Sequence, residues 1–264
     1  MLGTARRTTR SGRLMIFTIA ARELRSLFLS PLAWAVLAVV QFIMAFMFLT
    51  YVDNYMVWQP RLAAVEGAPG VADLIIAPTF EVAAIVLLLV APLITMRVLS
   101  EERRNRTLSL LFSAPVSMTE IVVGKYLGVL AFFLILLCLL ALMPISLLAG
   151  TQLDLGKLAA GLLGLTLLLA AFAAIGLFMS ALTDQPTIAA ISTFGLLLLL
   201  WIINMAGNGD NQGSSLFAYL SMLRHYETLL KGLFNSTDVV YYLLVIVLFL
   251  GLSIRRLDAD RLSH

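Results

Sequence analysis

Six long apolar segments constrain this chain more than any other feature of its sequence. They cover residues 31–51, 78–99, 126–149, 158–182, 187–206 and 239–254. A helix of roughly 20 apolar residues spans the hydrocarbon layer of a membrane, and backbone groups in lipid must bond within their own segment. The segments lack the period-two alternation of membrane-barrel strands. The sequence therefore predicts an all-α integral membrane protein with six transmembrane helices in a single domain, residues 1–264.

The composition supports a membrane protein. Hydrophobic residues make up 61% of the chain and charged residues 12%, whereas soluble domains have about 25% charged residues. Such a chain cannot cover its own surface with polar groups, so lipid must surround much of it. The single cysteine, Cys138, excludes an intrachain disulfide, and the sequence has no His, Cys or acidic cluster with metal-ligand spacing. We therefore expect no metal site.

The positions of lysine and arginine predict which helix ends face the cytoplasm. If the N-terminus is inside, 14 of the 18 basic residues fall in cytoplasmic segments. The four external ones are Arg61, Lys157, Arg224 and Lys231. This asymmetry predicts that both termini are cytoplasmic. The pI near 9.2 then reflects membrane orientation and not a nucleic-acid surface.

Residues 1–30 are expected to form a cytoplasmic tail that ends in an amphipathic helix over residues 13–29. A helix of this kind lies in the headgroup plane with its apolar side toward the lipid. The alternative is a frayed tail that merely contains some apolar residues. The apolar face consists of Phe17, Ala20, Ala21, Leu24, Leu27 and Phe28. The charged residues off this face are Arg22, Glu23 and Arg25.

The external segment 207–238 starts with a turn-rich stretch and then regains helical spacing. It is too polar to span a membrane, so it predicts a short external helix before the last span, or a pair of helices dipping into the outer leaflet. The residues at helical spacing are Tyr219, Met222, Leu223, Tyr226, Leu230 and Leu233.

The segment 100–125 is the one long charged passage between two apolar segments, and this topology places it in the cytoplasm. A short apolar run precedes Pro115, and the residue before a proline avoids helical geometry. Ser117 and Glu120 have the spacing of a capping box, which predicts a new helix from about Ser117. Gly124 and Gly128 would allow a close helix contact at its base.

These features predict a short helix held between two spans, with Leu108, Leu111 and Phe112 as apolar knobs for a cleft on a soluble partner. Basic residues beside it would orient the encounter. The alternative is an ordinary cytoplasmic loop whose apolar turn packs against its own bundle.

The same loop resembles the signature of type-2 ABC transporter permeases. The similar residues are Glu101-Glu102-Arg103, Arg106-Thr107-Leu108, Leu110-Leu111, Ser113-Ala114-Pro115-Val116 and Gly124-Lys125-Tyr126. Arg106 stands where glycine is commonest in that family. Length and topology agree across the whole chain, and His225-Tyr226-Glu227 with residues 238–242 resembles the gliding-motility-type branch.

The resemblance implies that residues 107–114 form a coupling helix seated in a cleft of a separate ATPase subunit. It implies a permease dimer above two ATPases, which would bind ATP and Mg²⁺, so this chain would have neither a catalytic residue nor a cofactor. The residues expected to couple to the ATPase are Glu101, Glu102, Arg103, Arg104, Arg106, Thr107, Leu108, Leu111, Phe112, Ala114 and Pro115.

The predicted function is therefore the permease subunit of an ATP-driven transporter, an exporter in the bacterial inner membrane, with an extracytoplasmic accessory subunit as a further candidate partner. The alternative is the membrane anchor of a mechanical or regulatory complex that acts on an external partner without moving a substrate. A secondary transporter or channel is disfavoured because the spans carry no chain of ionisable residues.

Two other features carry weaker functional meaning. Residues 150–158 faintly resemble a phosphate loop, but five residues separate the glycines and a leucine replaces the hydroxyl that would hold magnesium. Glu81, near the external end of the second span, is a candidate for the transport path because acids within membranes are functional candidates. Alternatively, it only marks the interface, where a helix N-terminus favours its charge.

Overall fold

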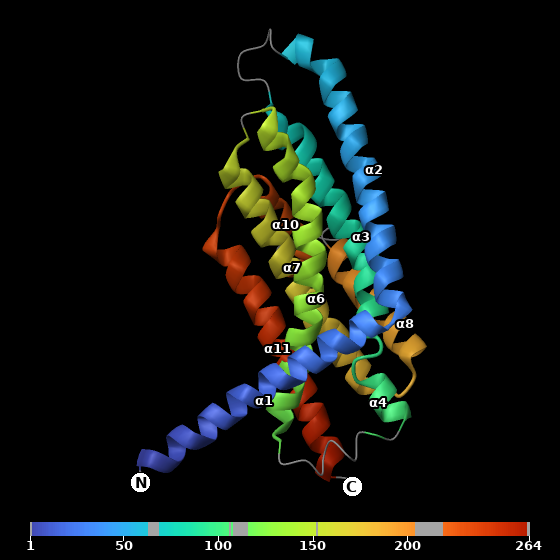
Figure 1. Ribbon diagram of the computed structural model, residues 1–264, viewed down its shortest axis with the longest axis vertical. Helices are drawn as coiled ribbons and strands as arrows, with labels where there is room; N and C mark the ends of the chain where they lie inside the picture. The colour runs from blue at the N-terminus through green and yellow to red at the C-terminus, as the bar shows by residue number, and fades with distance from the viewer. Residues whose placement is uncertain are drawn as a thin grey trace, which may run out of the picture.

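The computed structural model describes residues 2–62, 69–105, 107, 116–151, 153–203 and 219–262, and every regular element in these ranges is helical. The helices form an elongated bundle (Figure 1). In chain order the elements are α1 (Leu2–Leu29), α2 (Pro31–Leu62), η1 (Ala72–Ile76), α3 (Ala77–Thr95), α4 (Ser100–Arg104), α6 (Met118–Ser146), η2 (Leu147–Ala149), α7 (Leu155–Leu182), α8 (Pro186–Ile202), α10 (Met222–Leu230) and α11 (Ser236–Leu262).

Among the described residues, five helical segments are long and apolar enough to cross a membrane. They are Pro31–Arg61, Ala72–Arg104, Met118–Ala149, Leu155–Leu182 and Ser236–Arg261. The apolar helix α8 is shorter, and its 17 residues rise roughly 26 Å. With α8 as the sixth span, the prediction of an all-α membrane protein is confirmed.

Helix α7 is the centre of the bundle and packs against α3, α6, α8, α10 and α11. Glycines on α7 make this packing close. A Cβ at Gly161 would lie 2.6 Å from the ring of Phe80, and one at Gly164 would lie 3.2 Å from the Cβ of Leu229. Small residues let membrane helices approach closely, so α7 is surrounded by protein while α2 and α11 expose much of their apolar surface.

Helix α2 continues well beyond the expected end of the first span at residue 51. Its 32 residues rise roughly 48 Å, more than the ~30 Å hydrocarbon layer. The polar residues Asp53 and Asn54 ended the predicted span, but a helix that leaves the lipid satisfies its own backbone and needs no stop there. Figure 1 shows α2 reaching past the ends of its neighbours, opposite both termini.

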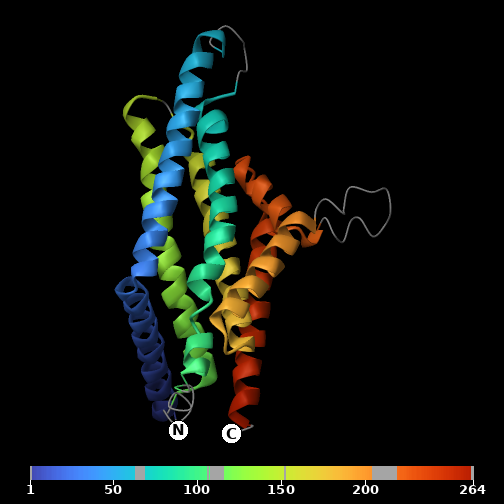
Figure 2. The ribbon, with the colours of Figure 1, turned by 90° about the vertical axis from the view of Figure 1, so that its right-hand side faces the viewer.

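The short helix α10 lies against the bundle instead of standing clear of it. Figure 2 shows α10 beside α11, below the end reached by α2. Tyr226 is fully buried and donates a hydrogen bond of 2.8 Å to the carbonyl oxygen of Phe80 in α3. Burial raises the pKa of Tyr226 well above its ordinary value, with smaller effects of Tyr242 and Glu81, so its hydroxyl stays a donor. The predicted short helix before the last span is therefore present as α10, and its position relative to the outer leaflet stays a prediction.

Both termini lie at the same end of the bundle, as the expected topology requires. Figures 1 and 2 show the start of α1, the end of α11 and α4 together at this end. Helix α1 runs obliquely along the outside of the bundle and packs mainly on α6. The fold therefore brings the first helix, the charged segment after α3 and the foot of α6 into one region.

Candidate functional site

Two glycines near the N-terminal end of α6 allow α1 to pack closely against this helix. A Cβ at Gly124 would lie 2.7 Å from the Cβ of Ile19, and one at Gly128 would lie 2.6 Å from the Cβ of Glu23 and 2.9 Å from the carbonyl oxygen of Ala20. Real Cβ atoms do not approach each other this closely, so only glycine fits without a shift of α1. The close contact expected from the two glycines is present, and its partner is the amphipathic N-terminal helix.

Lys125 lies between these glycines and is the centre of an ionic cluster. Its Nζ is 3.0 Å from Oε2 of Glu23 in α1, 2.8 Å from Oε1 of Glu102 in α4, and 2.9 Å from the carbonyl oxygen of Val98. We call these four residues the Lys125 cluster. Lys125 is 4% exposed, and its three N–H donors each have one acceptor. The cluster ties α1, α4 and α6 together.

A serine on α7 holds the break between α3 and α4. The hydroxyl of Ser180 accepts hydrogen bonds of 3.0 Å from the amides of Leu99 and Ser100, and donates one of 3.0 Å to the carbonyl oxygen of Met96. Ser180 is fully buried. Because buried backbone groups at a helix break need partners, this side chain fixes where α3 ends and how α4 leaves it.

Helix α4 also bonds to the last helix. Arg103 pairs with Asp260 of α11, and both side chains are mostly buried. The adjacent Arg104 is exposed and has no ion pair to another described residue. The two arginines predicted to act together therefore differ: one holds α4 to its own bundle, and the other is available to a partner.

Part of the predicted coupling segment lies outside the described residues: Arg106, Leu108, Leu111, Phe112, Ala114 and Pro115. Thr107 is exposed, and its amide donates a hydrogen bond of 3.0 Å to the carbonyl oxygen of Glu102. Beyond the gap, the predicted capping box is confirmed. Ser117 accepts from the amide of Glu120 at 3.2 Å, and Oε2 of Glu120 accepts from the amide of Ser117 at 2.9 Å.

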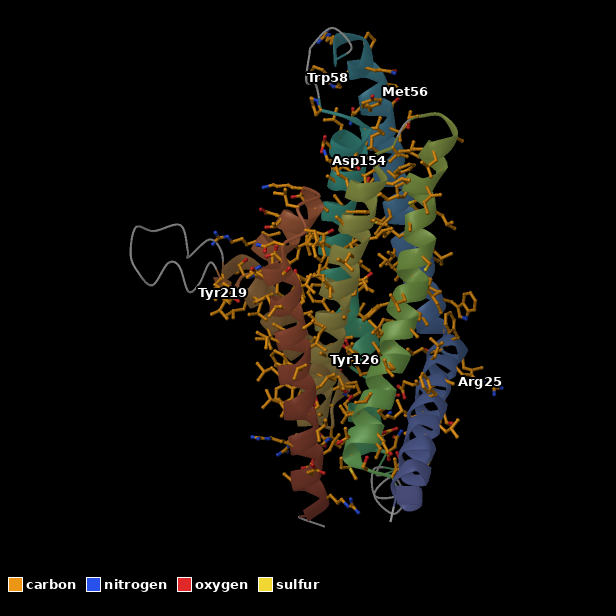
Figure 3. The ribbon with its side chains drawn as sticks, turned by 90° about the vertical axis from the view of Figure 1, so that its left-hand side faces the viewer. Arg25, Met56, Trp58, Tyr126, Asp154 and Tyr219 are labelled. Atoms are coloured by element: carbon orange, nitrogen blue, oxygen red, sulfur yellow. The ribbon has the colours of Figure 1, made fainter. Side chains whose placement is uncertain are left out.

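The residues expected on the interfacial helix lie in three different environments. Glu23 lies against α6 in the Lys125 cluster, although its charge suggested the headgroup region. Leu24 packs against the core, whereas Phe17 is 67% exposed. Arg22 and Arg25 are exposed, and Figure 3 shows Arg25 pointing away from the bundle. The helix thus has one side on the bundle and another free for the membrane surface.

Glu81 lies at the other end of the molecule and is exposed. It lines an open cleft of about 390 Å³ together with Asp73, Glu227 and Lys231. Nearby, Lys157 at the start of α7 pairs with Asp73 at 2.6 Å. The structure does not bring Glu81 together with the Lys125 cluster, and its role in a transport path stays a prediction.

Sequence reasoning missed a second buried polar group, at the α10–α11 junction. Nδ1 of His225 is 2.6 Å from Oδ1 of Asp238, Nε2 is 2.9 Å from the carbonyl oxygen of Tyr219, and the ring stacks on Tyr241. Both ring nitrogens lie within hydrogen-bond distance of an oxygen, so the two contacts fix the orientation of the ring. The one sequence signal was the motif formed by His225-Tyr226-Glu227 and residues 238–242, which did not indicate that His225 and Asp238 are in contact.

Comparison with known proteins adds one match. A family model described as "ABC-2 family transporter protein" matches residues 17–262, which include α2 to α11, the Lys125 cluster and the C-terminal part of α1. No curated protein matches the chain.

Proposed function

Because the chain belongs to the ABC-2 transporter family, we propose that this multi-pass membrane protein is a permease subunit driven by a separate ATPase, and that it works as an exporter. The ATPase docks at the end of the bundle that contains α4 and both termini, on the cytoplasmic side of a bacterial inner membrane. ATP and Mg²⁺ bind to the ATPase, and a second permease copy completes the transporter.

The Lys125 cluster is the observation that carries this proposal. The short helix α4 leads directly into the segment 107–114 that is expected to enter the ATPase cleft. A displacement of that segment moves α4 first. The contact of Glu102 with Lys125 transmits the movement to α6, and the contact of Lys125 with Glu23 transmits it to α1. Since a packed, bonded element moves as a unit, the cluster couples a cytoplasmic displacement to helices within the membrane.

Two further bonds spread the same motion. Arg103 links α4 to α11 through Asp260, and Ser180 links the α3–α4 break to α7. A displacement of α4 on the cytoplasmic side therefore moves four helices of the bundle, namely α1, α6, α7 and α11. A ligand or partner drives such a change only if it binds the two conformations with different affinity, which the ATP-bound and ATP-free forms of the ATPase supply.

The proposal is tested first by purifying the protein from its native membrane and identifying the chains that accompany it. An ATPase chain is expected, and purification without one contradicts the proposal. The complex is then placed in vesicles and assayed for ATP hydrolysis and for movement of candidate lipids or peptides. Hydrolysis without movement of any candidate favours the mechanical alternative.

A charge reversal tests the docking end directly. Arg104→Glu places a like charge at the proposed ATPase contact, which costs several kcal/mol in protein interfaces, so ATPase stimulation by the permease is expected to fall at least about tenfold. The matched control is Arg224→Glu, an exposed arginine on α10 toward the opposite end. Equal stimulation in both variants would show that this end is not the docking site.

A further inference from the structure

One face of α1 is exposed over residues 14–29. The exposed side chains recur every three or four positions, which is the spacing of a single helix face. Leu14, Phe17 and Leu29 are each at least 66% exposed, and Arg22 and Arg25 are exposed beside them. Large apolar side chains and arginines on one face are typical of a helix that lies on a membrane surface. We call this the outer face of α1, and it consists of Leu14, Phe17, Ala21, Arg22, Arg25 and Leu29.

The corner between α1 and α2 places the outer face at the level of the lipid headgroups. Nε1 of Trp34, in the first turn of α2, donates a hydrogen bond of 2.9 Å to the carbonyl oxygen of Phe28, and the two rings pack edge to face with centroids 5.6 Å apart. Trp34 is itself exposed, and tryptophan is enriched where a membrane meets water. Because the first span begins at this corner, α1 starts from the membrane surface, and Figure 1 shows it running obliquely from there across the bundle.

The charge of α1 is basic, and its one acid lies on the opposite side. Residues 1–30 contain six arginines against the single acid Glu23. Glu23 is bonded to Lys125 in α6, so it does not neutralise the outer face. By contrast, α4 and the last turns of α11 contain acidic and basic residues together. An amphipathic helix with roughly four to eight basic residues attracts anionic lipid. The six arginines of α1 are Arg6, Arg7, Arg10, Arg13, Arg22 and Arg25.

We propose that the outer face of α1 docks on anionic phospholipids, such as phosphatidylglycerol, in the membrane leaflet at this end of the bundle. The guanidinium groups of Arg22 and Arg25 bind phosphate oxygens, and the three large apolar side chains enter the boundary with the acyl chains. A leaflet of neutral lipid accepts the apolar side chains but supplies no net negative charge for the arginines. A soluble acidic protein would balance the arginines, but the corner at Trp34 holds this face where the headgroups lie.

Docking holds α1 from both sides. Its inner side packs on Gly124 and Gly128 and bonds to the Lys125 cluster, while its outer face contacts charged lipid. An interfacial position alone requires no particular lipid, whereas the excess of arginine on α1 requires a negative one. Docking does not depend on an ATPase, so this inference stands or falls separately from the proposed function.

The experiment places a fluorescent label on the outer face of the full chain in lipid nanodiscs. Cys138→Ser removes the one native thiol, which is exposed, and Ala21→Cys then carries a nitrobenzoxadiazole group. A phospholipid with a nitroxide on its acyl chain quenches this group only where the label reaches the lipid. The matched control position is Ala259→Cys, an exposed alanine of α11 at the same end of the bundle.

Quenching at position 21 is expected to rise at least about threefold as phosphatidylglycerol replaces phosphatidylcholine, and to fall back in about 1 M salt, where the Debye length is about 3 Å. Quenching at position 259 should not change with the lipid. Equal quenching at position 21 at every phosphatidylglycerol content would overturn the proposal. The absence of quenching in any lipid would do the same and would leave this face to a soluble partner.

A pair of double variants tests whether the arginines of the outer face carry the effect. Arg22→Gln with Arg25→Gln removes two charges from this face, and Figure 3 shows Arg25 pointing away from the bundle. Each basic residue near an anionic surface contributes about fivefold to binding, so docking should weaken about twentyfold and the titration should shift to higher phosphatidylglycerol content. The matched control, Arg255→Gln with Arg261→Gln, removes two exposed arginines from α11 at the same end. Identical titrations of the two double variants would show that net charge alone attracts the lipid, and would refute the site.

Discussion

Replacing Lys125 with methionine tests the role of the Lys125 cluster in the fold. At an effective dielectric constant of 20, attraction between unit charges at 2.8 Å and 3.0 Å amounts to about 6 kcal/mol each. Desolvation of the three charged groups costs several kcal/mol per ion, which offsets most of that attraction. The intact cluster therefore adds little net stability, whereas its disruption is expensive.

Lys125→Met leaves the carboxylates of Glu23 and Glu102 buried without their counter-ion. The loss of one partner from a buried ionic group costs about 3–5 kcal/mol, so the free energy of unfolding is expected to fall by about that amount. For a chain of this size the loss corresponds to a Tm decrease of about 6–15 °C. Thermal unfolding in detergent, followed by circular dichroism, measures it.

The triple variant Lys125→Met, Glu23→Gln and Glu102→Gln is the decisive control. It removes all three charges, so no carboxylate remains unpaired, and stability is expected to return to within about 1 kcal/mol of the native chain. ATPase stimulation should stay low in the triple variant because the bonds between α1, α4 and α6 are gone. If Lys125→Met is as stable as the native chain, the cluster does not join these helices.

Two other variants test the packing of α1 and α10. Gly128→Ala should lower the free energy of unfolding by about 1–3 kcal/mol because the added Cβ would meet α1. The control Gly251→Ala lies in open space on α11 and should be neutral or stabilising. Thermal unfolding compares the two variants, and equal effects would refute the close contact. His225→Phe should lower the free energy of unfolding by about 3–5 kcal/mol because it leaves the buried Asp238 unpaired. Adding Asp238→Leu should restore most of this stability. A double-mutant cycle on Tm measures the coupling, and additive losses would show that the two residues do not interact.

The helices and their order could be predicted from the sequence because their causes are local. Long apolar runs, basic residues at one side and the capping box at Ser117 each act within a few turns of the chain. The same local reasoning ended the first helix too early at residue 51. A polar residue marks where a helix leaves lipid, but it does not end the helix.

The members of the candidate site could be named in part, but not assembled. Glu23 and Glu102 were both expected to be functional, one on the interfacial helix and one in the coupling segment. Their common partner, Lys125, is 102 positions from Glu23, and no spacing rule connects residues so far apart. Ser180 gave no signal at all, since one serine in an apolar span has the same appearance whether or not it holds a backbone break.

The sequence by itself determined that this chain is a six-span helical membrane protein with its termini on one side, and it pointed to the charged segment after the second span as the functional region. Tertiary structure alone decided what that segment is bonded to: α1 and α6 through Lys125, α7 through Ser180 and α11 through Asp260. The physical reason is the distance along the chain over which each interaction acts. Hydrophobic periodicity and helix caps are properties of neighbouring residues, whereas a buried charge is stable only where packing places its counter-ions around it.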